Sequence, residues 1–257
     1  MLTKKKLEEF EQSGVVIVPN FLSKERVRRL KHAIDGLHGN AVYDKIDRWD
    51  MRNCLPHHTA FIELLGNKVL LGIIVQLLGF NVKLLASQIV KMNLRSKAEA
   101  LPIRWHRDGG ALNEELPDPL PPLFVKVGFC VSGSSKPQGG ELLLIPGSHR
   151  LIGEPVFDSS TDWPFGISKI LLEPGDIVIF DWRAWHAVNK NSSEVVRRML
   201  YLTFGFRWLA PIDYQAMPEE LLERSPIYGQ LLGGATKIGN YLPKQKDVPL
   251  MSLFEKE

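Results

Sequence analysis

The chain of 257 residues has little of what marks a secreted or membrane-spanning protein. It carries only two cysteines, Cys54 and Cys130, which are too few for a disulfide framework and favour a reducing compartment such as the cytoplasm. No apolar run reaches the roughly 18 residues that a membrane span needs. The N-terminus also lacks the apolar segment of a secretory signal. We therefore expect a cytoplasmic protein that is not bound to a membrane.

Strong charge of one sign is absent as well. The chain has 32 Lys and Arg against 29 Asp and Glu, and this net charge of +3 is too small to favour nucleic acid as a partner. The hydrophobic fraction of 44% and the charged fraction of 24% are ordinary for a globular protein. The expected partner is therefore a small-molecule substrate, while composition leaves the oligomeric state open.

Helix signals come first along the chain and strand signals follow. Helices are expected from Thr3 to Gly14, from Ser23 to Leu37, from Asn67 to Leu78 and from Pro218 to Glu223, because caps and apolar periodicity coincide there. Strands are expected over Val15 to Val18, Val82 to Met92, Phe124 to Val131, Glu141 to Ile145, Ile170 to Leu172, Ile177 to Phe180 and Met199 to Phe206.

This order predicts helices packed on one side of a double-sheet β domain. We expect a mainly β fold with packed helices, in which a double-stranded β-helix (a jelly-roll, cupin-like core) is flanked by N-terminal helices. The expected single domain spans residues 1–257, with a helical part over 1–80, the jelly-roll core over 81–210 and a C-terminal cover over 211–257. Residues 228–243 are glycine-rich and are expected to form a loop.

Three side chains form a candidate metal site. His106 and Asp108 are two residues apart, so on an extended strand both point to one face. His186 follows an apolar strand much later, and the two strands are expected to face each other in the mouth of the jelly roll. Two imidazoles and one carboxylate are typical of non-haem Fe(II) oxygenases, which keep three metal positions open. His149 is the less favoured alternative, because it follows a Pro-Gly turn.

A second candidate is an arginine that could bind a carboxylate. Arg197 and Arg198 stand at the start of an apolar strand, and side chains at successive positions point to opposite faces. Only one of them can therefore enter the core. A buried guanidinium is suited to holding a carboxylate through two parallel hydrogen bonds. Spacing alone does not decide between that role and two solvated charges at a strand end.

Several spaced motifs together resemble a known family. The matching stretches run from Gly14 to Ser23, from Trp105 to Asp108, from Pro146 to His149 and from Pro174 to Arg197. On these motifs the chain resembles the phytanoyl-CoA dioxygenase family of Fe(II)- and 2-oxoglutarate-dependent oxygenases. The resemblance covers about residues 1–210 in the same order.

The resemblance implies which residues bind the metal and the co-substrate. Fe(II) would be held by His106, Asp108 and His186. The arginine that pairs with the distal carboxylate of 2-oxoglutarate lies eleven residues after the second histidine, which implies Arg197. With O2 as the oxidant, these four residues would be the catalytic set.

The resemblance also implies two further contacts with 2-oxoglutarate. An aromatic ring lines its pocket from the strand before the Gly-Gly turn, which implies Phe129, although many members carry tryptophan there. A side chain on the strand that leads to the H-x-D motif faces the same pocket, and Gln88 is the candidate. The chain departs from the family after the second histidine, where Ala187 and Val188 replace a common Gly-Ser pair, so one expected hydroxyl is missing.

The implied reaction is oxidation, above all hydroxylation, of an aliphatic C–H bond in a small organic molecule, with release of succinate and CO2. Asp108 argues against halogenation, because related halogenases carry a small residue at that position. The alternative is a cupin-like metal-dependent isomerase or ligand-binding protein without 2-oxoglutarate chemistry. A catalytically silent relative is a third reading.

The substrate side of the pocket is less defined. Pocket candidates are Arg52, Gln88, Arg104, Trp182 and Arg207. Residues 109–123 follow the metal-binding aspartate directly and form either a mobile lid or a static, proline-stiffened loop. Because this segment is acidic, we expect a neutral or cationic substrate.

Overall fold

The main sheet of the protein has six antiparallel strands. The structure, a computed structural model, describes residues 1–37, 48–93, 103–161, 163–212, 217–233 and 248–254. The strands lie in the order β1 (Val15–Val18), β9 (Ile177–Asp181), β4 (Phe124–Ser132), β11 (Arg197–Phe206), β3 (Val82–Met92) and β2 (Arg48–Arg52). The part of the chain that was expected to be helical therefore also supplies both edge strands, β1 and β2.

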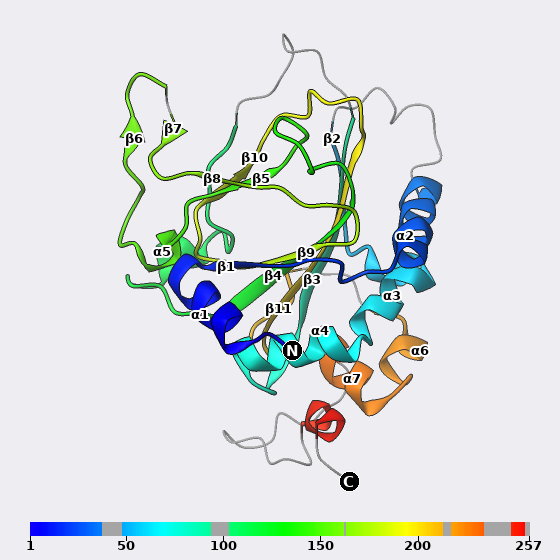
Figure 1. The fold of residues 1–257 in the computed structure, drawn as a ribbon. Helices are drawn as coiled ribbons and strands as arrows, with labels where there is room; N and C mark the ends of the chain where they lie inside the picture. Colours follow the sequence, from blue (N-terminus) through cyan, green and yellow to red (C-terminus); the bar gives the residue numbers. More distant parts are fainter. Residues whose placement is uncertain (38–47, 94–102, 162, 213–216, 234–247, 255–257) are drawn as a thin grey trace.

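A smaller sheet covers one face of the main sheet, as Figure 1 shows. It contains three antiparallel strands in the order β10 (His186–Val188), β5 (Leu142–Leu144) and β8 (Ser168–Ile170). A short hairpin of β6 (Phe157–Asp158) and β7 (Trp163–Pro164) projects beside it. The expected mainly β, jelly-roll fold with packed helices is confirmed. The strand expected over residues 170–172 is shifted, because β8 ends at Ile170.

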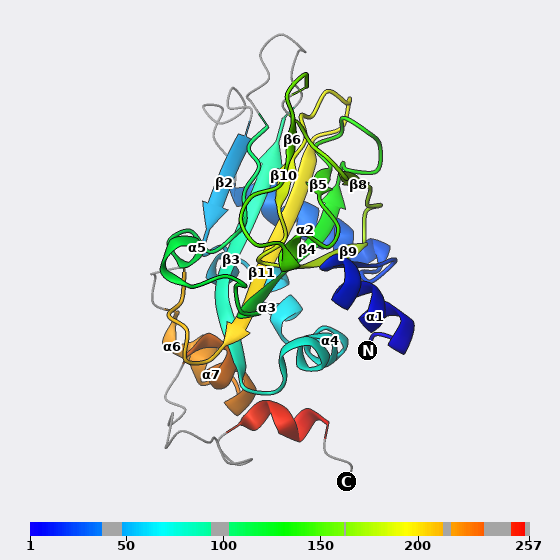
Figure 2. The same cartoon turned by 90° about the vertical axis from the view of Figure 1, so that its left-hand side faces the viewer.

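Helices cover the other face of the main sheet (Figures 1 and 2). The helical elements are α1 (Lys4–Ser13), α2 (Lys24–Leu37), η2 (Leu55–His57), α3 (Thr59–Leu65), α4 (Lys68–Leu78), α5 (Leu112–Glu115), η4 (Ser148–Arg150), α6 (Glu219–Leu222), α7 (Pro226–Leu232) and η6 (Pro249–Leu253). Capping explains two helix starts, since Thr3 accepts a hydrogen bond from Lys6 N and Asn67 accepts from Val69 N.

The prediction of a loop over residues 228–243 is wrong for its first residues, which belong to α7 (Pro226–Leu232). Ser225 caps α7, Pro226 takes its first turn and Tyr228 is buried. The helix continues to Leu232, and Gly233, at φ 82°, ends it in the left-handed conformation that glycine favours. The remainder of that expected loop, residues 234–247, lies outside the described residues.

Side-chain alternation on the main sheet separates a core shared with the helices from the apolar residues on the opposite face. On β4, Val125, Val127 and Phe129 belong to the core shared with the helices, whereas Cys130 belongs to the core between the sheets. On β11, Leu200, Leu202 and Phe204 belong to the core shared with the helices, whereas Met199 and Tyr201 belong to the core between the sheets. The face toward the smaller sheet is the one on which functional side chains gather.

No single helix in the described ranges is long and apolar enough to cross a membrane. The bent pair α3 and α4 meets the length and composition requirements together, with an angle of 47° between the two helices. Its apolar side chains, including Phe61, Leu65 and Leu71, are fully buried in the core.

Candidate metal and co-substrate site

Backbone pairing brings the three candidate metal ligands together. His106 N donates to His186 O at 3.0 Å and His186 N donates to His106 O at 2.9 Å. Asp108 N donates to Trp182 O at 3.0 Å, which holds the next part of the same segment. The expectation that the two ligand segments face each other is therefore wrong. They lie side by side as hydrogen-bonded neighbours, and this fixes their relative register.

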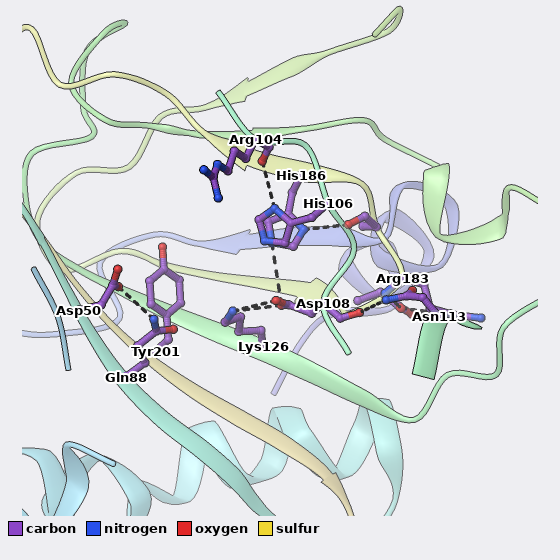
Figure 3. Close-up of polar contacts among 12 residues, drawn as sticks. Asp50, Gln88, Arg104, His106, Asp108, Asn113, Lys126, Arg183, His186 and Tyr201 are labelled. Atoms are coloured by element: carbon purple, nitrogen blue, oxygen red, sulfur yellow. Dashed lines mark hydrogen bonds and ion pairs between the residues drawn. The ribbon is translucent and has the colours of Figure 1, made fainter. Parts of the chain in front are cut away.

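The three side chains converge on one point, as Figure 3 shows. One ligand atom from each of His106, Asp108 and His186 lies within 4.8 Å of the other two. Nε2 of His186 is 3.9 Å from Oδ2 of Asp108, and the two imidazole ring centroids are 4.3 Å apart. Two nitrogen donors and one carboxylate in this grouping suit a divalent transition metal, with other positions left open.

Carbonyl groups fix the orientation of both imidazoles. Nδ1 of His186 lies 2.9 Å from Ala184 O, and Nδ1 of His106 lies 3.1 Å from Arg104 O. Because a carbonyl can only accept, each Nδ1 carries a hydrogen, which leaves Nε2 as the ring atom available to a metal. Such partners are typical of metal-binding histidines. Both rings are therefore ready to bind a metal through Nε2.

Electrostatics also prepares the ligands. Burial lowers the pKa of His186 to about 4, against the opposing charge of Asp108, so this ring is neutral at neutral pH. Burial disfavours the charged form of Asp108. The charges of Lys126 and the two histidines outweigh that effect and hold the pKa of this carboxyl below its usual value. Neutral imidazole and ionised carboxylate are the forms that bind metal.

A cavity of about 660 Å³ opens beside the triad. Its wall combines apolar, amide and basic side chains. The lining residues are Arg48, Gln88, Val90, Met92, Asn93, Arg104, Trp105, His106, Lys126, Leu142, Phe180, His186, Val188, Asn189, Lys190, Asn191 and Tyr201. A space of this size suits a small molecule next to the metal. Val188 lies in the wall at a position where the family often has a hydroxyl.

Arg197 and Arg198 occupy opposite faces of β11, as their spacing predicted. Arg197 is fully buried and donates to Tyr201 OH at 2.9 Å and to Ser134 Oγ at 3.2 Å. Arg198 instead donates to Asp35 of α2 at 2.8 Å, on the helix side. Among the described residues, no carboxylate pairs with Arg197. A buried guanidinium without a carboxylate is costly, so this arrangement points to an anionic ligand.

Space for Arg197 comes from the Gly-Gly turn. Gly140 has φ +77°, and a Cβ there would lie 2.6 Å from Cδ of Arg197. The Arg197 guanidinium lies directly behind the cavity wall, since Met92 and Tyr201 both contact it and both line the cavity. A carboxylate bound at this end of the cavity would meet Arg197 together with the Tyr201 hydroxyl.

Phe129 does not line the cavity, and this expectation is corrected. Its side chain is fully buried in the core under the helices and packs on Phe21 with ring centroids 6.2 Å apart. The cause is strand parity, because the cavity face of β4 carries the even-numbered residues. The ring that lines the cavity at this level is Tyr201, which is paired with Gly128. A Cβ on Gly128 would lie 2.7 Å from that ring.

Gln88 lies in the cavity wall, and its Nε2 donates to Asp50 Oδ1 at 3.0 Å (Figure 3). Its contact with 2-oxoglutarate stays a prediction. Of the other pocket candidates, Arg104 lines the cavity. The remaining three, Arg52, Trp182 and Arg207, are not among the lining residues.

The segment over residues 109–123 is tied to the protein at several points. Asn113 donates to Asp108 O at 3.0 Å, Arg183 donates to Leu120 O at 2.7 Å, and Trp182 donates to Pro121 O at 3.1 Å. Leu120 itself is buried. These contacts favour a fixed loop over a mobile lid. Its acidic residues are not among those that line the cavity.

Lys126 is a functional candidate that sequence reasoning missed. It lies in the cavity wall, and its Nζ is 3.1 Å from each carboxylate oxygen of Asp108. The available signal was a single lysine inside an otherwise apolar strand, FVKVGFCVS.

The fold and this site define a non-haem, metal-dependent oxygenase. The chain belongs to the phytanoyl-CoA dioxygenase family, whose sequence profile matches residues 10–199. Family membership confirms the expected class, an Fe(II)- and 2-oxoglutarate-dependent dioxygenase, and favours it over a cupin-like protein without 2-oxoglutarate chemistry.

Relatives of known activity agree with this class. Ectoine dioxygenase from Halomonas elongata is 24% identical over 239 residues, which cover 80% of this chain and 70% of the relative. The structure of HygX from Streptomyces hygroscopicus with nickel, 2-oxoglutarate and hygromycin B matches with a TM-score of 0.66 at 14% identity, covering 82% and 90% of the two chains. The carbocyclase SnoK from nogalamycin biosynthesis matches at 0.62 and 20%, covering 80% and 85%. The two structural likenesses show a shared fold.

Proposed function

We propose that the protein hydroxylates an aliphatic C–H bond of a small organic molecule and releases succinate and CO2. The observation that carries this proposal is the pairing of two features beside one cavity. His106, Asp108 and His186 gather their ligand atoms within 4.8 Å, and a fully buried Arg197 without a described carboxylate partner lies behind the same wall. A metal-dependent isomerase would have no use for that arginine.

In this proposal each residue has a separate task. His106, Asp108 and His186 would hold Fe(II), which, together with 2-oxoglutarate and O2, would supply the oxidising chemistry. Arg197 binds the distal carboxylate of 2-oxoglutarate, with Tyr201 OH beside it. The apolar residues of the cavity wall, among them Val90, Leu142 and Phe180, would keep water away from the C–H bond that reacts.

Asp108 supports hydroxylation over halogenation. Its carboxylate lies with the two imidazoles in the candidate metal group and would take a place on a bound metal that a halide would otherwise need. Relatives with the same fold have other outcomes, since SnoK is a carbocyclase and SnoN is an epimerase. We infer that the position of the substrate beside the metal selects among these outcomes.

Labelled dioxygen tests the outcome once a substrate is known. The proposal expects product that has gained one oxygen atom from O2, in equal amount to succinate. Product that has lost hydrogen without gaining oxygen would replace hydroxylation by desaturation or ring closure. Absence of succinate with any substrate would overturn the dioxygenase function itself.

We further propose that the substrate carries an anionic group, which reverses the expectation from the acidic loop. The charged cavity residues are all basic apart from the metal-binding region. Arg48 is compensated by Asp50 at 2.7 Å, whereas Arg104 and Lys190 have no acidic partner among the described residues. Figure 3 shows the Arg104 side chain above the space between His106 and Tyr201. An unpaired guanidinium there is suited to a carboxylate or phosphate.

Substitution of Arg104 by alanine is expected to reduce the apparent affinity for an anionic substrate about tenfold, the value of one charge-assisted hydrogen bond. The measurement is stimulation of succinate formation by paired small acids and their methyl esters at saturating 2-oxoglutarate. Arg28→Ala is the matched control, because this arginine is exposed on α2 and paired with Glu25. Equal stimulation by acids and esters, unchanged in Arg104→Ala, would contradict the proposal.

We propose one catalytic domain that acts on a small molecule in the cytoplasm, without nucleic acid or a membrane as partner. Cys54 and Cys130 are both buried and neither forms a disulfide, and burial raises the pKa of Cys130 to about 12, which makes it unreactive. The absence of a disulfide between these two cysteines agrees with a reducing compartment.

A further inference from the structure

Lys126 is a charged residue in the middle of a buried sheet. It is the third residue of β4, lies between β11 and β9, and has a side chain only 17% exposed. Its Nζ lies 5.4 Å from the centre of the Tyr201 ring and 6.0 Å from that of Phe180. A lysine buried in this way is costly unless its charge is paired, so its partner identifies its task.

That partner is the metal-binding carboxylate. Nζ of Lys126 lies 3.1 Å from Oδ1 and 3.1 Å from Oδ2 of Asp108 (Figure 3). An ammonium equally distant from both oxygens lies in the plane that passes midway between them, on the side away from the carboxylate carbon. A metal bound through both oxygens would need that same place. With Lys126 there, a metal can bind Asp108 through one oxygen only.

The positions of the imidazoles select that oxygen. Oδ2 of Asp108 lies 3.9 Å from Nε2 of His186, so Oδ2 is the oxygen turned toward the metal position. Lys126 can then stay hydrogen-bonded to Oδ1. A six-coordinate metal held by the two imidazoles and Oδ2 would have three open positions, and it would have two if both oxygens of Asp108 were bound.

We propose that Lys126 is a positioning residue that restricts Asp108 to one-oxygen coordination and so keeps a metal position free for O2 after 2-oxoglutarate has bound. This inference rests on the proposed function. It also predicts that Lys126 has two opposing effects, because an ammonium close to a divalent cation lowers the affinity for the metal. The lysine therefore improves turnover at the expense of metal affinity.

A scaffold role and a positioning role give different results on substitution. If Lys126 only holds the fold together, Lys126→Met weakens metal binding and succinate formation together. If it positions Asp108, Lys126→Met binds metal as tightly as the native protein or more tightly, because repulsion is removed and a second oxygen becomes available. Succinate formation without substrate then falls at least tenfold, while anaerobic binding of 2-oxoglutarate changes less than about twofold.

The experiment measures both quantities on the full chain. Mn(II) affinity is measured by calorimetry, and the visible spectrum of the Co(II)-substituted protein reports the number of ligands on the metal. Lys126→Arg keeps a cation at Asp108 and is expected to retain most of the succinate formation. Lys91→Met is the matched control, since Lys91 is a buried lysine on β3 that lies 3.8 Å from Asp35 on the helix side.

Several outcomes would overturn the inference. One is parallel loss of metal affinity and succinate formation in Lys126→Met, and another is native succinate formation in that variant. A Co(II) spectrum identical to that of the native protein would also contradict it. If the native protein forms no succinate, the proposed function fails instead, and the affinities and Co(II) spectra still decide whether Lys126 restricts Asp108.

Discussion

Substitution of His186 by alanine is expected to reduce succinate formation from 2-oxoglutarate by more than about 100-fold, because changes even to the partners of metal ligands cost 10- to 100-fold. His186 is buried, neutral and held by Ala184 O with Nε2 toward Asp108. The candidate metal group among the described residues consists of His106, Asp108 and His186, so a bound metal would keep two of these three ligands. The measurement is succinate formed after O2 is added to anaerobically loaded protein.

The control for this substitution is His32→Ala, because His32 is exposed on α2 and lies outside the candidate metal group. It is expected to leave both metal binding and succinate formation unchanged. Thermal unfolding of the metal-free proteins separates loss of the ligand from loss of the fold. A folded His186→Ala protein with near-native succinate formation would exclude His186 as a metal ligand.

The second large effect is expected on the KM for 2-oxoglutarate, from substitution of Arg197 on β11. Arg197→Ala is expected to raise the KM for 2-oxoglutarate about 100-fold, which corresponds to roughly 3 kcal/mol for one partner of a buried charge pair. Arg197 is fully buried, and Tyr201 and Ser134 orient its guanidinium. The measurement is the dependence of succinate formation on 2-oxoglutarate concentration.

Arg198→Ala is the matched control on the opposite face of the same strand. It breaks the pair with Asp35, whose side chain is 37% exposed, and is expected to lower the free energy of unfolding by about 1 kcal/mol at most. The KM for 2-oxoglutarate should be unchanged. Equal effects of the two substitutions on this KM would show that the arginines act through the fold and not through the co-substrate.

The metal ligands could be predicted from sequence because their evidence is local. His106 and Asp108 share one short motif, and His186 follows a strand that apolar residues define clearly. Their relative placement could not be predicted, since it depends on backbone pairing between His106 and His186. That pairing joins residues far apart in the sequence, and no local pattern records it.

The assignment of Phe129 to the cavity, which came from the resemblance, is wrong, whereas the alternation of side chains along β4 gives the correct face. The family places an aromatic ring near the Gly-Gly turn, and Phe129 is the aromatic residue at that point. On β4, however, Val125, Val127 and Phe129 face the helices. The cavity instead receives a ring from the neighbouring strand, Tyr201, across Gly128. A contact of this kind depends on register between strands, which sequence alone leaves undetermined.

The basic character of the cavity could not be predicted from the sequence either. Acidic residues directly after Asp108 suggested a site unsuited to anions, but hydrogen bonds from Arg183 and Trp182 fix that segment at Leu120 and Pro121. The cavity takes its basic side chains from four separate parts of the chain, at Arg48, Arg104, Lys126 and Lys190. Closeness in sequence to the metal ligand was therefore a poor guide to closeness in space.

Anaerobic titration of 2-oxoglutarate into the Fe(II)-loaded protein tests the central assignment most directly. Chelation of Fe(II) by the keto acid gives a visible charge-transfer absorption, so metal and co-substrate are observed in one signal. We expect this absorption in the native protein and in Arg198→Ala at the same midpoint, at a much higher midpoint in Arg197→Ala, and not at all in His186→Ala. An absorption that develops equally in all four proteins would contradict the assignment of this site.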